Sequence, residues 1–321
     1  MSKFQKEFEK ALKLIKKSND ILIVSHKNPD GDTVGSNLSL RQVLISDFGK
    51  NVTSACVDPL PNSLLFLADS NIFENKIDPN KHDLIITVDA SSIDQLKFAE
   101  IDERLLKSGK DIINIDHHPT NKKFGTLNIV DENVSCATEI LYYFFEFIGA
   151  TIAPNTATYL LAGLYNDTGS FMHSNTSPSS YKMASKLLEA GAALPRIVKH
   201  MFKTQSVEQL RLWGKVLSNA RMNKKGTLVS KVTNNDFYET NSSPRDLMGV
   251  INYLNSVSQS NLSVLLSEDM KGHVKGSMRT VKDDVDVASL CEKLGGGGHK
   301  KAAGFTIPGK IVTEEVWRIE E

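Results

Sequence analysis

The 321-residue sequence has few cysteines and no long hydrophobic run. Cys56, Cys136 and Cys291 are far apart in the chain, so we expect buried, reduced thiols and neither a disulfide framework nor a zinc-binding Cys-x-x-Cys pair. No apolar run approaches the roughly 20 residues that a membrane-spanning helix needs, and residues 1–20 are charged, unlike a signal peptide. We therefore expect a cytoplasmic protein with no membrane partner.

The sequence also lacks an excess of charge of either sign. Lys and Arg number 38, as do Asp and Glu, so any electrostatic preference has to come from local clusters, and we expect no long nucleic acid as a partner. Hydrophobic residues make up 40% of the chain and charged residues 24%, as in ordinary globular proteins. A chain of this length is expected to form two domains.

Short β-branched runs alternate with helical segments over the first 191 residues. The expected strands are residues 21–26, 52–58, 84–89, 112–116 and 127–130, and the expected helices are residues 156–165 and 179–191. ILIV at 21–24 and LIITV at 84–88 are apolar on both faces, as central strands covered by helices on each side are. This pattern predicts an α/β fold, with a doubly wound, mostly parallel sheet in residues 1–191.

A smaller α/β domain is expected after a helical connector. We assign residues 192–212 to the connector and residues 213–321 to the second domain. Its expected strands are residues 227–232, 262–267, 273–278 and 304–307, with a helix at 287–294. Four glycines follow at 295–298, and we interpret them as a functional backbone segment, because His-Lys-Lys and a strand come directly after them.

The first chemical motif is VSHKNPDGDTVGS at 24–36. An apolar strand ends at His26, and a Pro-Asp-Gly-Asp turn precedes a helix, which is where α/β proteins place their sites. Gly31 allows a tight turn that aims Asp30 and Asp32 at neighbouring points. The alternative is a surface turn with the helix N-cap at Asp32, and this motif alone fits both interpretations.

Two further motifs end in a single carboxylate. LIITVDASS at 84–92 ends its strand at Asp89, which by itself is also compatible with a cap of the next helix. LYNDTGSFMHSNTS at 164–177 breaks at Asp167, and the alternative here is a helix C-terminal turn with Gly169 in the left-handed conformation.

The remaining motif, INIDHHPTN at 113–121, ends a strand on Asp116, His117 and His118. Such a triplet can place one imidazole on a metal ion and another toward a substrate, with the carboxylate in support. Neighbouring residues of a strand point to opposite faces, so two purely structural histidines would need separate hydrogen-bonded niches. We therefore favour a functional role.

Charge balance joins the four motifs into one metal site. Four carboxylates packed together repel one another unless cations are present, and their four negative charges balance two divalent ions. Oxygen-rich ligation with two imidazoles favours Mn²⁺ or Mg²⁺ over zinc, and the histidines make Mn²⁺ the first choice. The predicted ligands are His26, Asp30, Asp32, Asp89, His117 and Asp167.

In this order along the chain, the four motifs resemble the DHH phosphoesterase superfamily, named for the triplet at 116–118. GSMRT at 276–280 and GGGGHKKAAGF at 295–305 are similar to the DHHA1 substrate-binding domain, which the manganese inorganic pyrophosphatases lack. The resemblance covers nearly the whole chain and is greatest to the bacterial nanoRNase subfamily. Thr33 stands where the family often has a smaller residue, a departure that we expect to concern local packing only.

The resemblance also implies individual roles. One metal ion would be held by His26, Asp30 and Asp89, and the other by Asp32, Asp89, His117 and Asp167, with Asp89 as the bridge. Asp116 would orient a histidine and His118 would face the scissile phosphate, so the catalytic group is Asp89, Asp116 and His118. The implied substrate-binding residues are Ser277, Arg279, Gly296, Gly297, Gly298, His299 and Lys300.

Two metal ions can clamp phosphoryl oxygens and stabilise an in-line displacement. The resemblance implies a manganese phosphodiesterase that cuts short single-stranded oligoribonucleotides to mononucleotides and converts 3′-phosphoadenosine 5′-phosphate to AMP. One alternative is a phosphodiesterase for cyclic dinucleotides or linear pApA. An alternative of another class is a nucleotide-binding regulator, and the complete ligand set argues against it. RNA versus DNA, substrate length, cutting direction and oligomeric state stay open.

Overall fold

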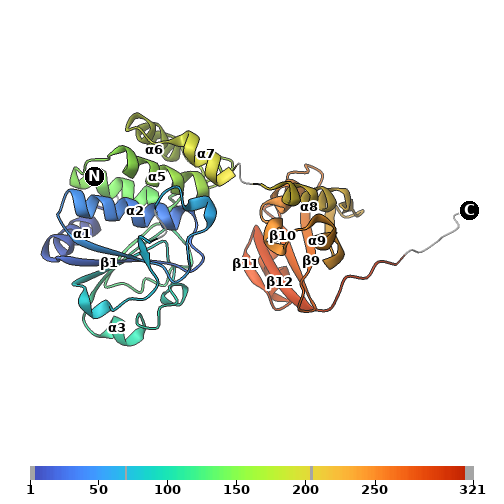
Figure 1. Cartoon of the computed structure of the whole chain (residues 1–321), viewed down its shortest axis with the longest axis horizontal. Helices are drawn as coiled ribbons and strands as arrows, with labels where there is room; N and C mark the ends of the chain where they lie inside the picture. Colours follow the sequence, from blue (N-terminus) through green and yellow to red (C-terminus); the bar gives the residue numbers. More distant parts are fainter. Residues whose placement is uncertain (1–3, 69–70, 203–204, 315–321) are drawn as a thin grey trace, which may run out of the picture. The chain divides into compact units, whose positions relative to one another are not determined.

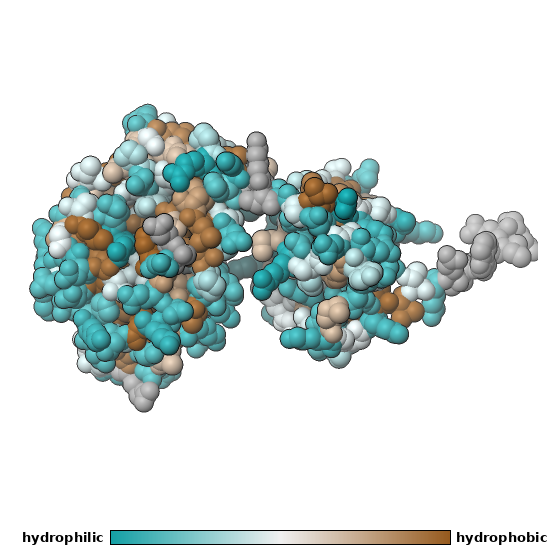
Figure 2. All heavy atoms as spheres, in the orientation of Figure 1, coloured by the Kyte–Doolittle hydropathy of each residue, from teal (hydrophilic) through white to brown (hydrophobic). Residues whose placement is uncertain are grey.

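The computed structural model describes residues 4–68, 71–202 and 205–314. The chain divides into two compact units, Met1–Thr204 and Gln205–Glu321, and each is described by itself (Figure 1). Within the described residues, no helix is long and apolar enough to cross a membrane. Hydrophilic residues cover most of the visible face of each unit, and hydrophobic residues gather in patches on the first (Figure 2).

The first unit is built on a six-stranded parallel sheet with the strand order β3-β2-β1-β4-β5-β6. Its strands are β1 (Asp20–Ser25), β2 (Asn51–Ala55), β3 (Phe73–Glu74), β4 (Leu84–Val88), β5 (Asp111–Asp116) and β6 (Leu127–Val130). Each of the five expected strands forms, and among the strands of the described residues in this unit only the short β3 was not predicted. The winding direction reverses between β1 and β4, which is the switch point where open α/β sheets bind ligands at their carboxyl edge. The predicted α/β class with a parallel sheet is confirmed.

Helices cover both faces of this sheet, as the apolar central strands predict. The larger core lies under α1 (Gln5–Lys17), α2 (Gly31–Ser46), α4 (Ala137–Ile148), α5 (Pro154–Asp167) and α6 (Pro178–Glu189). In Figure 1, α2 and α5 lie on one side of the sheet and α3 (Glu103–Lys107) on the other. Ile21 of β1 packs in the larger core, while its neighbour Leu22 packs in the smaller one with Leu96 and Phe98. Both faces of β1 are therefore buried.

Glycines allow α2 and α5 to pack at very short distance. A Cβ atom on Gly35 of α2 would lie 2.4 Å from the carbonyl oxygen of Tyr159 in α5. A Cβ atom on Gly163 of α5 would lie 2.7 Å from Oδ1 of Asp32 and 2.5 Å from Cγ2 of Thr138. Side chains at these two positions would push the helices apart, so the glycines determine how closely Asp32 approaches α5.

The second unit is built on a mixed six-stranded sheet with the order β11-β12-β10-β9-β8-β7. Its strands are β7 (Arg221–Met222), β8 (Thr227–Val232), β9 (Leu262–Glu268), β10 (His273–Arg279), β11 (Gly297–His299) and β12 (Ala302–Pro308). Only β8 and β9 pair in parallel. Its helices are α8 (Val207–Ser218), α9 (Asn234–Thr240), α10 (Val250–Asn255) and α11 (Val287–Glu292). Leu212, Phe237 and Val250 lie in one core, and Val287, Cys291 and Phe305 in another.

The segment expected to be a connector contributes to both units. α7 (Leu194–Phe202) packs against α5 in the first unit, and its Ile197 is fully buried in the first core. α8 packs against β8 and α9 in the second unit, where Leu212 is fully buried. The chain passes from one unit to the other between residues 204 and 205. The predicted boundaries at 191 and 212 are not tested by these contacts and stay predictions.

The close packing of α2 on α5 predicts the effect of one methyl group. Gly35→Ala should lower the free energy of unfolding of the first unit by about 1–3 kcal/mol, because the new Cβ meets backbone atoms that have no rotamer with which to yield. Gly214→Ala is the matched control, since Gly214 is an exposed residue of α8 with no atom within 4 Å of its added Cβ. It should stabilise α8 by about 0.4–1 kcal/mol. Urea unfolding that shows Gly35→Ala as stable as the wild type would contradict this packing.

Candidate metal centre

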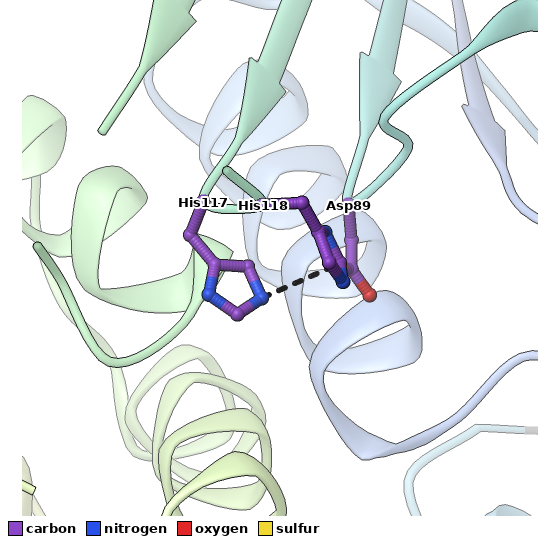
Figure 3. Close-up of side chains that lie close together, drawn as sticks. All are labelled: Asp89, His117 and His118. Carbon is purple, nitrogen blue, oxygen red and sulfur yellow. Dashed lines mark ion pairs between the residues drawn. The ribbon is translucent and has the colours of Figure 1, made fainter. Parts of the chain in front are cut away.

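The predicted ligands converge at the carboxyl edge of the parallel sheet, beside the switch point between β1 and β4. His26, Asp89 and His117 directly follow the strands β1, β4 and β5. Asp30 and Asp32 lie at the N-cap and in the first turn of α2, and Asp167 is the last residue of α5. Figure 3 shows Asp89, His117 and His118 converging from the ends of neighbouring strands. Parallel strands bring their carboxyl ends to the same edge, so residues far apart in the sequence meet here.

The ligand atoms form three groups, each with all of its atoms within 4.8 Å of one another. The groups are His26, Asp30 and Asp89; Asp32, His117 and Asp167; and Asp89, His117 and His118. The first is the ligand set that the family resemblance implies for one ion. The second is the implied set for the other ion without Asp89, whose Oδ1 lies 3.6 Å from Nε2 of His117.

Two buried atoms at the centre of the cluster make no hydrogen bond to any described residue, as expected for atoms that bind cations. Oδ1 of Asp89 and Nε2 of His117 have no hydrogen-bond partner among the described residues. The imidazole nitrogen lies 3.2 Å from Oδ2 of Asp167 and 4.0 Å from Oδ2 of Asp32, so carboxylate oxygens surround it. Leaving a buried polar atom unpaired costs about 1–3 kcal/mol. Oxygen and imidazole ligands are the donor set of Mn²⁺ and Mg²⁺, and the residues fit two such ions.

Asp89 is held in an unusual backbone conformation. Its φ of 55° lies in the left-handed region, and its N–H donates to the carbonyl of Ile115 in β5 (2.9 Å). Oδ2 accepts from Thr33 Oγ1 (2.6 Å) and lies 3.2 Å from Nε2 of His26, whereas Oδ1 faces His117. Burial raises the pKa of Asp89. The hydrogen bond from His26 and the charges of the nearby imidazoles lower it by more than burial raises it, so the net pKa lies below the usual value.

Asp30 and Asp32 have different structural roles. Asp30 is the N-cap of α2, where its Oδ1 accepts from the N–H groups of Asp32 and Thr33. The possibility that Asp32 caps this helix is therefore wrong. Asp32 lies inside the first turn, is fully buried, and accepts from the N–H groups of Ala137 (2.6 Å) and Thr138 (2.9 Å) at the start of α4. The N-terminus of α4 thus stabilises the negative charge of Asp32.

The cluster holds protons where cations would bind. Burial and the neighbouring carboxylates raise the pKa of Asp30 to about 6 and that of Asp32 well above its usual value. Burial lowers the pKa of His26 and His117, but the carboxylates close to the two rings, Asp89 beside His26 and Asp167 beside His117, outweigh it and raise these pKa values to about 9 and about 10. In the metal-free protein, protonated imidazoles therefore offset part of the carboxylate charge.

The triplet at 116–118 has a geometry that the strand pattern does not predict. His117 and His118 lie side by side, with ring centroids 4.5 Å apart, and both face the cluster (Figure 3). The expectation that adjacent histidines point to opposite faces is wrong here, because β5 ends at Asp116 and both histidines lie in the loop that follows. Nδ1 of His118 lies 2.7 Å from Oδ1 of Asp116, so Asp116 orients His118.

Asn121 is a residue of this network that the motifs did not single out. Its Nδ2 donates to Oδ2 of Asp116 (2.6 Å), to Oδ1 of the buried Asn114 (2.9 Å) and to the carbonyl of Ala90 (3.2 Å). It therefore ties Asp116 to the loop that follows Asp89. The available signal was its place in INIDHHPTN, five residues after Asp116.

In the second unit, the predicted substrate-binding residues lie on neighbouring strands. Arg279 of β10 and His299 of β11 both pair with Ala302 of β12, and Ser277 and Gly297 both pair with Gly304. Directly paired residues point to the same face of a sheet, so these four positions share one face. Lys300 follows β11 directly.

The last two glycines of the four-glycine run, Gly297 and Gly298, begin β11, whereas Gly295 and Gly296 precede the strand. Two glycines of the run are required by close packing. A Cβ on Gly296 would lie 2.1 Å from the carbonyl oxygen of Gly304, and one on Gly298 would lie 2.6 Å from that of Ala302. Gly297 is different, since no atom lies within 4 Å of its added Cβ. Its missing side chain leaves open space on the face that carries Arg279 and His299.

A parallel α/β sheet that gathers carboxylates and imidazoles at its carboxyl edge can hold divalent cations, an arrangement that metal-dependent hydrolases use. The model of the DHH family, N-terminal domain, matches residues 20–164, and that of the DHHA1 domain matches residues 224–319. The chain is 31% identical to the bifunctional oligoribonuclease and PAP phosphatase NrnA of Thermus thermophilus, over 94% of this chain and 88% of that protein. It is 28% identical to the protein of that name from Mycoplasma genitalium, over 95% and 94%.

A solved structure has a similar fold. The exopolyphosphatase-related protein from Bacteroides fragilis matches with a TM-score of 0.87 and 25% identity, over 97% of this chain and 94% of that one. The chain belongs to the DHH family and carries a DHHA1 domain. The predicted family is confirmed, and with it the class of metal-dependent phosphoesterases.

Removing the charge of Asp89 should abolish the paired site. Asp89→Asn keeps the shape and tolerates the left-handed conformation, but it removes the carboxylate that faces both ligand groups. With Mn²⁺ at 100 times the dissociation constant, each bound ion should add about 2.7 kcal/mol of stability to the wild type, and the variant should lose this gain for at least one ion. Asp94→Asn changes an exposed carboxylate and is the control. Two tightly bound ions in Asp89→Asn, measured by metal analysis, would show that Asp89 is not the bridge.

Metal binding should release protons. Ligation requires neutral imidazoles and charged carboxylates, whereas in the metal-free protein the pKa values of His26 and His117 are about 9 and about 10. The apparent affinity for Mn²⁺ should therefore rise between pH 7 and 9, by about tenfold per pH unit for each proton displaced. Calorimetric titration in two buffers of different ionisation enthalpy measures the number of protons. A heat that is independent of the buffer would rule out this exchange.

Proposed function

We propose that the chain is a two-metal phosphodiesterase that hydrolyses short single-stranded oligoribonucleotides to mononucleotides and also converts 3′-phosphoadenosine 5′-phosphate to AMP. The observation that carries this proposal is the ligand cluster with two buried atoms that make no hydrogen bond within the described residues, Oδ1 of Asp89 and Nε2 of His117. Support comes from relatives named bifunctional oligoribonuclease and PAP phosphatase, which match 94% and 95% of the chain. The cytoplasmic location stays a prediction.

Two divalent ions, with Mn²⁺ preferred and Mg²⁺ as the alternative, would neutralise charge on the phosphoryl oxygens when bound. His26, Asp30 and Asp89 would hold one ion, and Asp32, His117, Asp167 and again Asp89 the other. In the metal-free protein the unpartnered Oδ1 of Asp89 faces the second group, while Oδ2 faces His26. Each oxygen of Asp89 thus faces one ligand group, and each would bind one ion.

His118 is the residue that we expect to contact the phosphate. The hydrogen bond that His118 donates to Asp116 raises the pKa of His118, although burial opposes this, so the imidazole stays cationic to a higher pH than usual. Nδ1 is occupied by Asp116 at 2.7 Å. The proton on Nε2 remains available to donate to a phosphate oxygen or to the leaving oxygen.

The second unit would bind one end of the substrate. Arg279 and His299 lie on one face of the β10-β12-β11 strands, next to the open space that Gly297 leaves. A guanidinium can grip a phosphate with two hydrogen bonds. The chain as a whole has no excess of positive charge, since 38 basic residues balance 38 acidic ones. Proteins that bind long nucleic acids contact successive phosphates with many basic residues. This favours short substrates.

A substrate panel tests the proposed activity. RNA and DNA oligomers of two to five nucleotides, 3′-phosphoadenosine 5′-phosphate, pApA and a cyclic dinucleotide are incubated with the metal-loaded protein. We expect the highest kcat/KM on short RNA, together with release of AMP from the bisphosphate. A preference for pApA or the cyclic dinucleotide would support the alternative phosphodiesterase. Binding without turnover would indicate a regulator, and either result would overturn the proposal.

Truncating Arg279 should weaken substrate binding without affecting the metal ions. Hydrogen bonds to a charged group contribute about 1.5–3 kcal/mol, so Arg279→Ala should raise KM by about 10- to 100-fold. Arg221→Ala is the matched control, because Arg221 is an exposed arginine on β7, at the opposite edge of the same sheet. Steady-state kinetics and metal analysis on both variants measure the effect. Unchanged kinetics in Arg279→Ala would exclude this residue from the site.

A further inference from the structure

The hydroxyl of Thr33 lies in the middle of one ligand group. Its Oγ1 is 2.5 Å from Nε2 of His26, 2.6 Å from Oδ2 of Asp89 and 3.1 Å from Oδ1 of Asp30. The residue is fully buried in the first turn of α2. One hydroxyl therefore contacts all three members of the group formed by His26, Asp30 and Asp89.

The hydrogen atoms available on Thr33 and His26 determine which hydrogen bond the Thr33 hydroxyl makes once a cation binds. A hydroxyl donates one hydrogen, and a carboxylate only accepts. Nδ1 of His26 lies 2.6 Å from the carbonyl of Lys27, so this nitrogen carries the ring hydrogen when the imidazole is neutral. Nε2 then offers its lone pair to the cation and has no hydrogen for Thr33. The hydrogen of Thr33 must go to a carboxylate, and Oδ2 of Asp89 is the nearer one.

The two oxygens of Asp89 face different neighbours. Oδ2 faces Thr33 and His26, whereas Oδ1 lies 3.6 Å from Nε2 of His117 and 3.7 Å from Nδ1 of His118, without a hydrogen bond. A hydrogen bond from Thr33 holds Oδ2 on the side of His26 and, because the carboxylate is planar, directs Oδ1 toward His117. Thr33 therefore acts on the side of one ion only.

We propose that Thr33 is a positioning residue for the cation held by His26, Asp30 and Asp89. Its hydroxyl fixes the rotation of the Asp89 carboxylate. Oδ2 of Asp89 would then bind this ion, and Oδ1 would bind the ion held by Asp32, His117 and Asp167. This inference rests on the two-metal site of the proposed function. It goes beyond the expectation that the residue at this position concerns local packing only.

Three substitutions at Thr33 separate its hydroxyl from its shape. Thr33→Val keeps the volume and removes the hydroxyl, Thr33→Ser keeps the hydroxyl, and Thr33→Ala removes the hydroxyl without placing a second methyl group against the carboxylates. Thr156→Val is the matched control, because Thr156 is a fully buried threonine of α5 whose Oγ1 has no hydrogen-bond partner among the described residues. It undergoes the same chemical change away from Thr33.

The experiment is a Mn²⁺ titration of the full metal-stripped chain, followed by calorimetry and electron paramagnetic resonance. The wild type, Thr33→Ser and Thr156→Val should bind two ions and show the spectrum of a coupled pair. Thr33→Val and Thr33→Ala should keep one ion at wild-type affinity and bind the other about 10- to 100-fold more weakly. At one equivalent they should show the signal of an isolated Mn²⁺ ion.

Three results would overturn the inference. Two ions bound by Thr33→Val and Thr33→Ala as in the wild type would show that the hydroxyl does not position the bridge. An equal loss of affinity for both ions would indicate a general structural role of Thr33. Weak binding of the ion at His26, Asp30 and Asp89 by Thr33→Ser would indicate the same. If the wild-type chain binds no Mn²⁺, the two-metal proposal itself fails, which distinguishes that failure from the failure of this inference alone.

Discussion

Repulsion among four clustered carboxylates is the constraint on which the rest of this structure depends. Asp30, Asp32, Asp89 and Asp167 meet at one edge of a sheet, and such a cluster is unfavourable unless positive charge enters it. In the metal-free protein that charge comes from protonated imidazoles and from the N-terminus of α4, which binds both oxygens of Asp32. Two divalent cations would replace the protons and bind Oδ1 of Asp89 and Nε2 of His117, which make no hydrogen bond among the described residues.

The fold serves this constraint by bringing distant residues to one place. Parallel strands deliver their carboxyl ends to the same edge, and the reversal of strand order between β1 and β4 opens a space there. Gly35 and Gly163 let α2 and α5 approach until Asp32 lies beside α5. Asp89 takes a left-handed backbone conformation that sends its two oxygens to different ligand groups. A left-handed aspartate costs backbone energy, as residues at functional sites often do.

Much of the first sheet and of the ligand set could be predicted, because apolar runs on both faces and acidic strand ends are local properties of the sequence. The features that could not be predicted from the sequence depend on contacts between segments that are far apart in the chain. The strand β11 includes two glycines, which have low strand propensity, and Gly298 lies too close to β12 for a side chain. His117 and His118 face one site because β5 ends just before them. The position of Thr33 against Asp89 follows from the docking of α2 at the end of β4, which sequence periodicity does not encode.

Two cations that share the carboxylate of Asp89 are the central feature of the proposed site. Anomalous diffraction at the manganese edge, from crystals of the full chain grown with Mn²⁺, measures this directly. We predict two anomalous peaks about 3.5–4 Å apart, one at His26 and Asp30, one at Asp32, His117 and Asp167, with Asp89 between them. A single peak, or two peaks with Asp89 bound to neither ion, would contradict the account.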